Sequence, residues 1–387
     1  MCIGQLGNLL PHMAVPAIMA QHLIPAWHLT SAEAGLMAGS FALGYTLAVP
    51  ILTALTDRYD ARLIVLGGSA LTTLGTLTFG VFANGLVSAC PIWFFTGIAF
   101  AGSYMPGLKS LTDRLPPGEN SRAITCYTSS FSLGVGLSFL VMQVVADRFG
   151  WRTAFFVVAL GPLLMVTACL AMAPHRPAGR DTHVFDFRPA IRNREAFGYI
   201  LGYGAHGFEL YGIRTWIVGF WAFVMGHHAV HSAWLSPVAV SVMFTLAAMP
   251  ASIIGNEAAL RFGRHRALTV VMLSSAAIAV LIGVTAASPP WLLLPLVLIY
   301  ATTVTADSGA LTAGMLSAAT PGFRGVTMAM HSTIGFGLAG AGSWGTGIAL
   351  DAAGGADSPT GWLAAFCVLA VGAAFGPLAL AWSRHKS

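Results

Sequence analysis

The chain has 387 residues, of which 19 are Lys or Arg and 14 are Asp or Glu, so only 9% is charged, against roughly 25% in a soluble globular protein. Hydrophobic residues make up 56% of the chain, and glycine occupies 44 positions. This composition excludes a disordered chain, a nucleic-acid-binding domain and an ordinary soluble enzyme. It predicts a polytopic membrane protein, with room for about twelve spans of about 20 apolar residues each.

The spans are predicted from runs without charge, because a charge at the bilayer centre costs at least about 2.5 kcal/mol. The predicted helices cover residues 3–25, 34–55, 62–84, 87–111, 122–145, 152–173, 197–224, 234–256, 267–287, 291–314, 325–349 and 361–383. Proline and charge cluster in the best-defined turns between them, such as residues 57–62 and 288–290. The predicted fold class is therefore an all-α membrane protein with twelve transmembrane helices.

Lysine and arginine are distributed unequally over the two ends of these helices. Sixteen of them fall after even-numbered helices or at the C-terminus, whereas only Arg148 and Arg152 fall on the other side and Arg214 lies inside a helix. Cytoplasmic loops carry the excess of basic residues in membrane proteins. We therefore predict a multi-pass protein of the cytoplasmic (inner) membrane, with both termini in the cytoplasm.

One polar connection, residues 174–195, is longer than the others and contains five arginines. It separates two halves of six predicted helices each. The halves carry similar short sequences at corresponding places, such as residues 45–50 and 244–250, which favours an internal duplication. The predicted organisation is an N-terminal bundle, residues 1–173, a cytoplasmic linker, residues 174–195, and a C-terminal bundle, residues 196–387.

Six plus six helices, a basic middle loop and a charged turn after the second helix of each half together resemble the major facilitator superfamily. The turn pattern of that family, G-x-x-x-D-R-x-G-R-R, appears here as TALTDRYDAR over residues 53–62. Three of its four charged positions are matched, by Asp57, Arg58 and Arg62. Thr53 and Asp60 stand where the family has glycines. Within the superfamily, residues 102–116 are most similar to the cyanate and nitroimidazole transporter group.

The resemblance implies a secondary active transporter that works by alternating access of two pseudo-symmetric bundles. A carboxylate beside arginines at a helix end can pair with the neighbouring bundle and release it. The predicted cytoplasmic gate consists of Asp57, Arg58, Arg62, Glu257, Arg261 and Arg264. The alternative is that these charges only fix the topology and solvate two turns.

The resemblance also implies that helices 1, 4, 7 and 10 line the central cavity, where ionisable residues are expensive unless they are paired or functional. The predicted substrate-binding residues lie on these helices and on helix 11: Asn8, His12, Tyr104, Lys109, His206, Tyr211, Arg214 and His331. Glu209 and Asp307 are predicted to carry protons, because a carboxyl group in such a cavity can load and release one.

Structural roles are the alternatives for several of these residues. Arg214 and Glu209 would then form an ion pair inside the bundle, and Lys109 would extend its side chain to the cytoplasmic surface. His12 and His331 would be packing histidines. His227, His228 and His231 have the spacing of metal ligands, but no Cys or carboxylate stands nearby to complete a set, so no metal site is predicted.

The predicted function is proton-coupled symport of a small, anionic organic solute, with the bilayer, the solute and protons as partners and the protein as a monomer. The alternative is an efflux pump for amphipathic drug-like compounds, although Trp93 stands where drug–proton antiporters carry an arginine in helix 4. No Walker, H-E-x-x-H or G-x-S-x-G sequence occurs. The sequence therefore indicates neither a cofactor, nor an ATP-driven pump, nor an enzyme.

Overall fold

The computed structural model describes residues 1–115, 120–175, 186–230, 232–320 and 323–384. Within these ranges the protein is helical and contains no strand, which confirms the predicted all-α class. The chain divides into two compact units. Unit 1 comprises residues 1–27 and 40–183, and unit 2 comprises residues 28–39 and 184–387.

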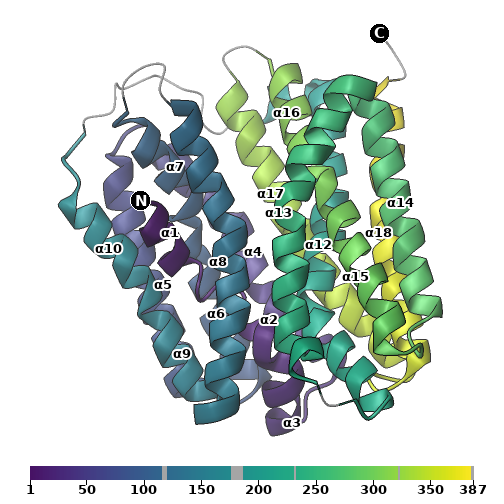
Figure 1. The fold of residues 1–387 in the computed structure, drawn as a ribbon. Helices are drawn as coiled ribbons and strands as arrows, with labels where there is room; N and C mark the ends of the chain where they lie inside the picture. The colour runs from purple at the N-terminus through teal and green to yellow at the C-terminus, as the bar shows by residue number, and fades with distance from the viewer. Residues whose placement is uncertain (116–119, 176–185, 231, 321–322, 385–387) are drawn as a thin grey trace. The chain divides into compact units, whose positions relative to one another are not determined.

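Unit 1 is a bundle whose helices come from the first half of the chain (Figure 1). They are α1 (Cys2–Asn8), α2 (Ala14–Ile18), the π-helix Met19–Leu23, α3 (Ile24–Trp27), α4 (Ser31–Leu55), α5 (Ala61–Phe82), α6 (Leu86–Ala101), α7 (Tyr104–Thr112), α8 (Asn120–Phe149), α9 (Trp151–Ala159) and α10 (Gly161–Ala171). Within it α1 packs against α8 and α10, and α5 packs against α6, α9 and α10.

Unit 2 is organised around its longest helix, α12. Its helices are α11 (Arg188–Arg192), α12 (Arg194–His227), the 3-10 helix Ala233–Leu235, α13 (Pro237–Phe262), α14 (Arg264–Val284), α15 (Pro290–Ala306), α16 (Ser308–Ala318), α17 (Arg324–Ala352) and α18 (Pro359–Arg384). The helix α12 packs against α13, α15, α16, α17 and α18. The polar residues in the middle of α12, such as His206, Glu209 and Arg214, are therefore buried.

Glycines allow α12 and α17 to approach closely, as is common between membrane helices. A Cβ atom built on Gly342 would lie 2.0 Å from the backbone oxygen of Phe208, and one on Gly207 would lie 2.4 Å from the oxygen of Gly335. No larger residue fits at these two positions without moving a helix backbone.

The first turns of α4 belong to unit 2, whereas the helix from Ser40 onward belongs to unit 1. The carboxylate of Asp351, at the end of α17, accepts hydrogen bonds from the backbone N–H groups of Ser31 at 2.9 Å and Ala32 at 2.7 Å. These are two of the N–H groups that a helix leaves without an intrahelical partner. The side chain of Asp351 therefore caps the start of α4.

Several predicted spans are interrupted, which is a correction to the continuous helices expected from the sequence. The predicted helix 3–25 is divided into α1, α2, a π-helical turn and α3, because Pro11, Pro16 and Pro25 lack a backbone N–H and clash with the preceding turn. Three other spans change helix at residues 102–103, at Leu160 and at Asp307. Each break therefore places a few non-helical residues within a predicted span.

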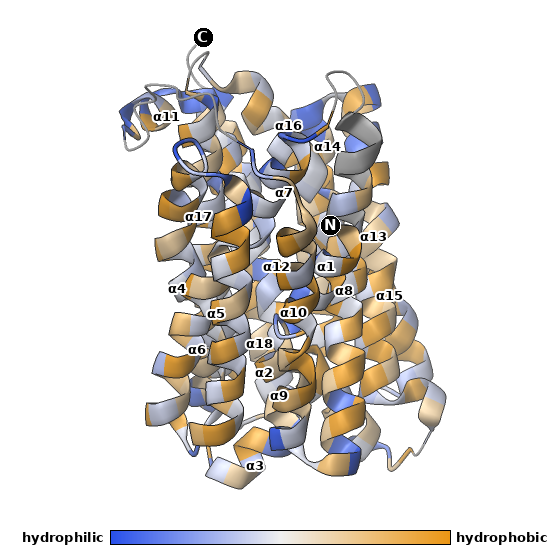
Figure 2. Cartoon of the chain, turned by 90° about the vertical axis from the view of Figure 1, so that its left-hand side faces the viewer, coloured by the Kyte–Doolittle hydropathy of each residue, from blue (hydrophilic) through white to orange (hydrophobic). Residues whose placement is uncertain are grey.

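Among the described residues, nine helices or joined helix pairs are long and apolar enough to cross a membrane. The sequence predicts twelve spans. The other three predicted spans, α1–α3, α12 and α17, fall outside the nine, and α12 contains the buried residues His206, Glu209 and Arg214. Figure 2 shows hydrophobic residues along the lengths of the helices and hydrophilic residues gathered mostly near their ends.

Candidate functional site

The candidate site is built on α12, which begins at Arg194 and is capped by the Asn193 side chain, an acceptor for the N–H of Ala196. The side chains of His206, Glu209 and Arg214 are 3%, 1% and 4% exposed. Ionisable groups in membrane helices are rare, and they mark ion pathways or ligand sites by default. The chemistry available in this part of unit 2 therefore depends on which groups these three side chains contact.

The carboxylate of Asp307 contacts the imidazole of His206, with 2.7 Å between Oδ1 and Nδ1. Both side chains are almost fully buried. Asp307 occupies the break between α15 and α16, and its side chain does not cap α16. The carboxylate is therefore directed to α12, where it forms an ion pair whenever His206 is protonated.

The rings of Tyr203 and of His331, which lies on α17, stack next to this pair. The Tyr203 ring lies 5.3 Å from that of His206 and 3.8 Å from that of His331, stacked with both. His331 Nε2 is 3.3 Å from the Thr312 hydroxyl on α16. The structure thus brings together three predicted site residues, His206, Asp307 and His331. Tyr203 was missed by sequence reasoning, although it precedes His206 by three residues and so shares its helix face.

Glu209 has a separate set of partners on α14 and α15. The Ser275 hydroxyl donates a hydrogen bond of 2.7 Å to Glu209 Oε1, and the Thr303 hydroxyl lies 3.5 Å from Ser275 Oγ. The fully buried Tyr300 interacts with the same carboxyl group. Glu209 and Asp307 are therefore two distinct acidic sites, each surrounded by groups that can exchange hydrogen bonds.

Arg214 forms none of the ion pairs found in the described part of the chain. Its guanidinium carbon lies 5.8 Å from the ring centroid of Tyr211, which in turn packs on Phe336. The alternative pair with Glu209 is not formed, since that carboxyl group binds Ser275. Arg214 is a buried cation whose immediate neighbour is an aromatic ring.

In unit 1, Asn8 is the last residue of α1 and His12 lies in the break between α1 and α2. His12 is surrounded by the rings of Phe100, Phe41 and Phe131, at centroid distances of 5.0, 5.5 and 5.6 Å. Asn8 is fully buried, and neither its amide oxygen nor its nitrogen has a hydrogen-bond partner among the described residues. Tyr104 stacks on Tyr127 at 5.8 Å.

Lys109 lies in a cluster of charges at one end of unit 1. Its Nζ atom is 3.1 Å from Asp113 and 4.0 Å from Asp57, and its side chain is 31% exposed. Arg58 is exposed. These contacts join a predicted gate residue, Asp57, to a predicted substrate residue, Lys109, and leave both partly open to solvent.

Asp60 has the most contacts of the acidic residues in this part of unit 1, although it was not predicted as a site residue. Its carboxylate accepts hydrogen bonds from Arg114 at 2.7 and 2.9 Å, from the N–H of His175 at 2.8 Å and from the N–H of Arg62 at 3.0 Å. Burial acts to raise the pKa of Asp60, but these donors prevail and lower that pKa below its usual value. Its position directly before a helix, where Asp is a preferred cap, was the available signal.

The predicted gate residues of unit 2 are more exposed. Arg261 and Glu257 form an i,i+4 ion pair of 2.9 Å with exposed side chains, and Arg264 donates a hydrogen bond of 3.0 Å to the Ser317 hydroxyl. The pairing of Glu257 with its own helix is the geometry of a solvated surface pair. The gate remains a prediction.

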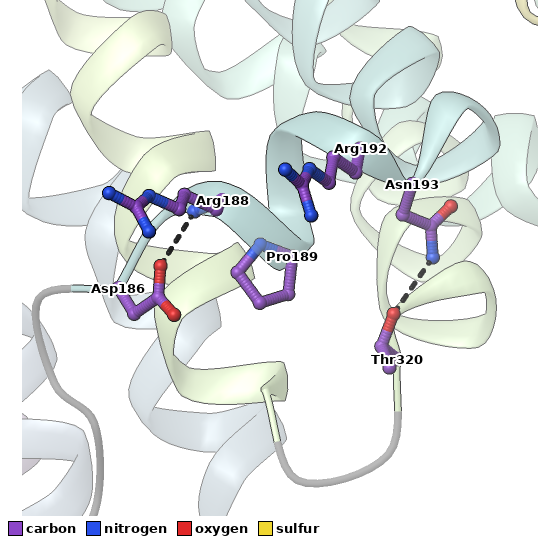
Figure 3. Close-up of a pocket in the computed structure, with 6 residues that line it drawn as sticks. All are labelled: Asp186, Arg188, Pro189, Arg192, Asn193 and Thr320. Carbon is purple, nitrogen blue, oxygen red and sulfur yellow. Dashed lines mark hydrogen bonds between the residues drawn. The ribbon is translucent and has the colours of Figure 1, made fainter.

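A polar pocket of about 590 Å³ is lined by the C-terminal part of the predicted linker and by Thr320 (Figure 3). Figure 3 shows Asp186 bonded to the backbone N–H of Arg188, and Asn193 bonded to Thr320. Arg188 is exposed. Residues 176–185 of the predicted linker lie outside the described ranges.

His227 and His228 lie at the end of α12 and have separate surroundings. His228 Nε2 lies 3.0 Å from the backbone oxygen of Ala287, and the His227 and His228 rings are 5.1 Å apart at nearly right angles. His231 is outside the described ranges. No group of three or more His, Cys, Asp or Glu residues in the described ranges is arranged to hold a metal ion.

Comparison with known proteins identifies the class of protein that this fold and site define. The sequence model of the Major Facilitator Superfamily matches residues 1–343. The chain therefore belongs to this superfamily of membrane transporters. It is a multi-pass secondary transporter and not an enzyme.

Solved structures with the same fold share little sequence with it. A bacterial homologue of the human lysosomal transporter Spinster, in an inward-facing and occupied conformation, is 18% identical with a TM-score of 0.72, and the match covers 99% of this chain and 93% of that one. The nucleoside transporter NupG is 14% identical with a TM-score of 0.75, and the match covers 99% of this chain and 98% of that one. The TM-scores establish the shared fold. Sequence identities this low do not indicate which solute the protein transports.

Proposed function

We propose that the protein is a proton-coupled transporter of a small, anionic organic solute in the cytoplasmic membrane, with both termini in the cytoplasm. Transport proceeds by alternating access of two six-helix bundles, residues 1–173 and 196–387. The observation that carries this proposal is the buried contact of 2.7 Å between Asp307 and His206, at a helix break.

A carboxylate and a histidine in contact form an acceptor and donor pair for one proton. Protonation of Asp307 removes its negative charge and weakens its attraction to His206. The break between α15 and α16 can then move away from α12. Deprotonation restores the contact. Chains of Asp, Glu and His residues inside membrane helices serve as proton relays in pumps and transporters, and Glu209 supplies a second acid one turn along α12.

Arg214 supports an anionic solute. It is 4% exposed and forms no ion pair with the described carboxylates. An uncompensated buried charge is costly, and a negatively charged ligand supplies the missing partner. The planar guanidinium favours a carboxylate or phosphate group, which it binds with two parallel hydrogen bonds.

The test has two steps. A thermal-shift screen of carboxylates, phosphate esters and matched neutral solutes on the purified protein first identifies a ligand. Uptake of that ligand into proteoliposomes is then measured with and without a pH gradient. We expect the gradient to drive uptake in the wild type and not in Asp307→Asn or Glu209→Gln, whereas exchange of solute across the membrane without a gradient persists in both.

The matched control is Asp357→Asn, which removes an exposed carboxylate outside the membrane helices. Its uptake should follow that of the wild type. Uptake that ignores the gradient in the wild type and in all three variants would remove proton coupling from the proposal.

Efflux of amphipathic drug-like compounds is the second candidate function. The observation in its favour is the apolar, aromatic surrounding of His12, formed by Phe41, Phe100 and Phe131. Such rings suit a flat, cationic aromatic compound. Extrusion of a fluorescent dye from loaded proteoliposomes, lost in Phe100→Ala and insensitive to Arg214→Gln, would favour efflux over uptake of an anion.

A further inference from the structure

An apolar groove of about 790 Å³ runs along the outer side of unit 2, between α12, α17 and α18. It is lined by Leu201 and Phe208 on α12, Leu338 on α17, and Val371, Phe375 and Leu378 on α18. The three residues of α18 are 63–67% exposed. No described side chain of the protein covers them, so the membrane supplies what fills this groove.

The groove is longer than one layer of lipid chains. Its lining on α18 extends from Cys367 to Trp382, which corresponds to about 22 Å at the helical rise of 1.5 Å per residue. The hydrocarbon core of a bilayer is about 30 Å thick, so each leaflet contributes about half of that. An acyl chain that enters at the Trp382 end can therefore lie in the groove over its full depth in one leaflet.

The two ends of the groove differ in charge. The guanidinium of Arg194 lies 4.6 Å above the Trp382 ring, and Phe197 packs edge-on against the same ring. The Nε atom of Arg194 has no hydrogen-bond partner in the described structure, and none of the ion pairs there includes this residue. The opposite end, at Cys367 and Val368, has no charged lining residue.

More positive charge lies near the Trp382 end. Arg384 follows Trp382 by two residues in the last turn of α18, on another face of the helix. Tryptophan is enriched at the headgroup level of membranes, and basic pockets between membrane helices bind anionic headgroups. The stacking on Trp382 holds the Arg194 guanidinium at the groove mouth.

We propose that this groove binds an anionic phospholipid. Its phosphate group contacts Arg194, and one acyl chain fills the apolar groove along α18. The preference for a negative headgroup comes from the unpaired guanidinium at the mouth, since the groove itself accepts any acyl chain. This site is separate from the buried cluster of His206, Asp307 and Glu209.

The test compares two lipids with the same chains, dioleoyl phosphatidylglycerol and dioleoyl phosphatidylcholine, added to delipidated protein in detergent. We expect phosphatidylglycerol to raise the melting temperature more, because a ligand of the folded state stabilises it. Native mass spectrometry of the wild type should show a retained phosphatidylglycerol adduct. Arg194→Gln should lose most of the difference between the lipids, and Arg194→Lys should keep part of it.

The matched control is Arg261→Gln, which removes an exposed positive charge from α13, away from the groove. It should keep the full difference between the two lipids. Val371→Trp, which places a bulky ring on an exposed wall of the groove, should reduce the shift caused by both lipids.

Three results would overturn the proposal. The first is an equal temperature shift by the two lipids in the wild type, and the second is an undiminished difference between the lipids in Arg194→Gln. The third is a native mass spectrum that shows a dimer without a lipid adduct, dissociated by Val371→Trp, which would assign the groove to another copy of the chain.

Discussion

Arg114 donates hydrogen bonds from its Nη2 atom to both carboxylate oxygens of Asp60, at 2.7 and 2.9 Å. Asp60 stands where the superfamily pattern has a glycine. Its carboxylate also binds the backbone N–H groups of Arg62 and His175. One side chain therefore joins the start of α5, the residues after α7 and the residues after α10.

We predict that Asp60→Gly, which restores the family residue, destabilises unit 1. The change leaves Arg114, whose side chain is 17% exposed, without its carboxylate. Breaking a largely buried pair in this way costs about 3–5 kcal/mol when solvent is fully excluded, so about 2–3 kcal/mol is expected here. Thermal unfolding in detergent measures the loss.

The matched control for this substitution is Asp57→Asn. Asp57 lies 4.0 Å from Lys109 and is 40% exposed, and such pairs contribute little. Its melting temperature should stay close to that of the wild type. A melting temperature of Asp60→Gly equal to that of Asp57→Asn would show that the Asp60 contacts contribute little to stability.

The stabilising effect of Asp60 should depend on pH. Its pKa is lowered in the folded protein, so its contribution is fully present above the unfolded pKa, about 3.9, and is lost as the pH falls through the folded pKa. The difference in stability between wild type and Asp60→Asn should therefore be constant from pH 7 to about pH 5. It should shrink below about pH 4. Melting curves of both proteins across this range test the sign, and a difference that grows on acidification would contradict it.

His206 and Asp307 should be energetically coupled. Removing either one leaves the other group buried at 2–4% exposure without its partner, whereas removing both leaves no unpaired charge. We expect His206→Gln and Asp307→Asn each to lower stability, and the double variant to lose about 1–3 kcal/mol less than their sum. The cycle is measured by thermal unfolding. Additive effects would mean that the contact contributes no stability.

The sequence predicted the helical class, the superfamily and the polar character of α12, because these depend on composition and on local patterns. Glu209, Arg214 and Asp307 were recognisable as charges within apolar runs. Their partners were not, since Asp307 lies 101 residues after His206 and only the packing of α15 against α12 brings them together. The two residues that share a helix face, His206 and Glu209, have different partners.

The helix breaks were also not predicted from the runs of apolar residues. No charged residue stands close to Leu160 or Ser103 in the sequence, so a search for charge-free stretches passes through these positions. Proline was a usable signal at Pro11, which lies in the break between α1 and α2. Asp307 ends α15 without a proline, and here the carboxylate contact with α12 accompanies the break.

Two glycines of α17, three residues apart, should respond differently to the same substitution. A Cβ atom at Gly342 would lie 2.0 Å from the backbone oxygen of Phe208, whereas at Gly345 the nearest such contact is 3.7 Å. Gly342→Ala should lower the melting temperature, because the backbones of α12 and α17 must separate. Gly345→Ala should leave it unchanged or raise it, since alanine favours the helix by about 1 kcal/mol. Equal effects would contradict the close packing.

Arg214 should determine the charge of the solute that stabilises the protein. For an anionic ligand found by the thermal-shift screen, we expect Arg214→Gln to lose most of the increase in melting temperature that the ligand causes in the wild type. Loss of a charge-assisted hydrogen bond of about 1.5–3 kcal/mol weakens binding by roughly 10- to 100-fold. Arg214→Lys keeps the charge without the bidentate geometry and should retain part of the shift.

The apparent affinity of each protein for the ligand is measured by titration, and Arg58→Gln serves as the control because Arg58 is exposed at the end of α4. This control should bind the anion as the wild type does. Because Arg214 has no carboxylate partner among the described residues, its removal should affect the liganded protein more than the free one. An anion that binds Arg214→Gln with unchanged affinity would place the anionic group elsewhere in the protein.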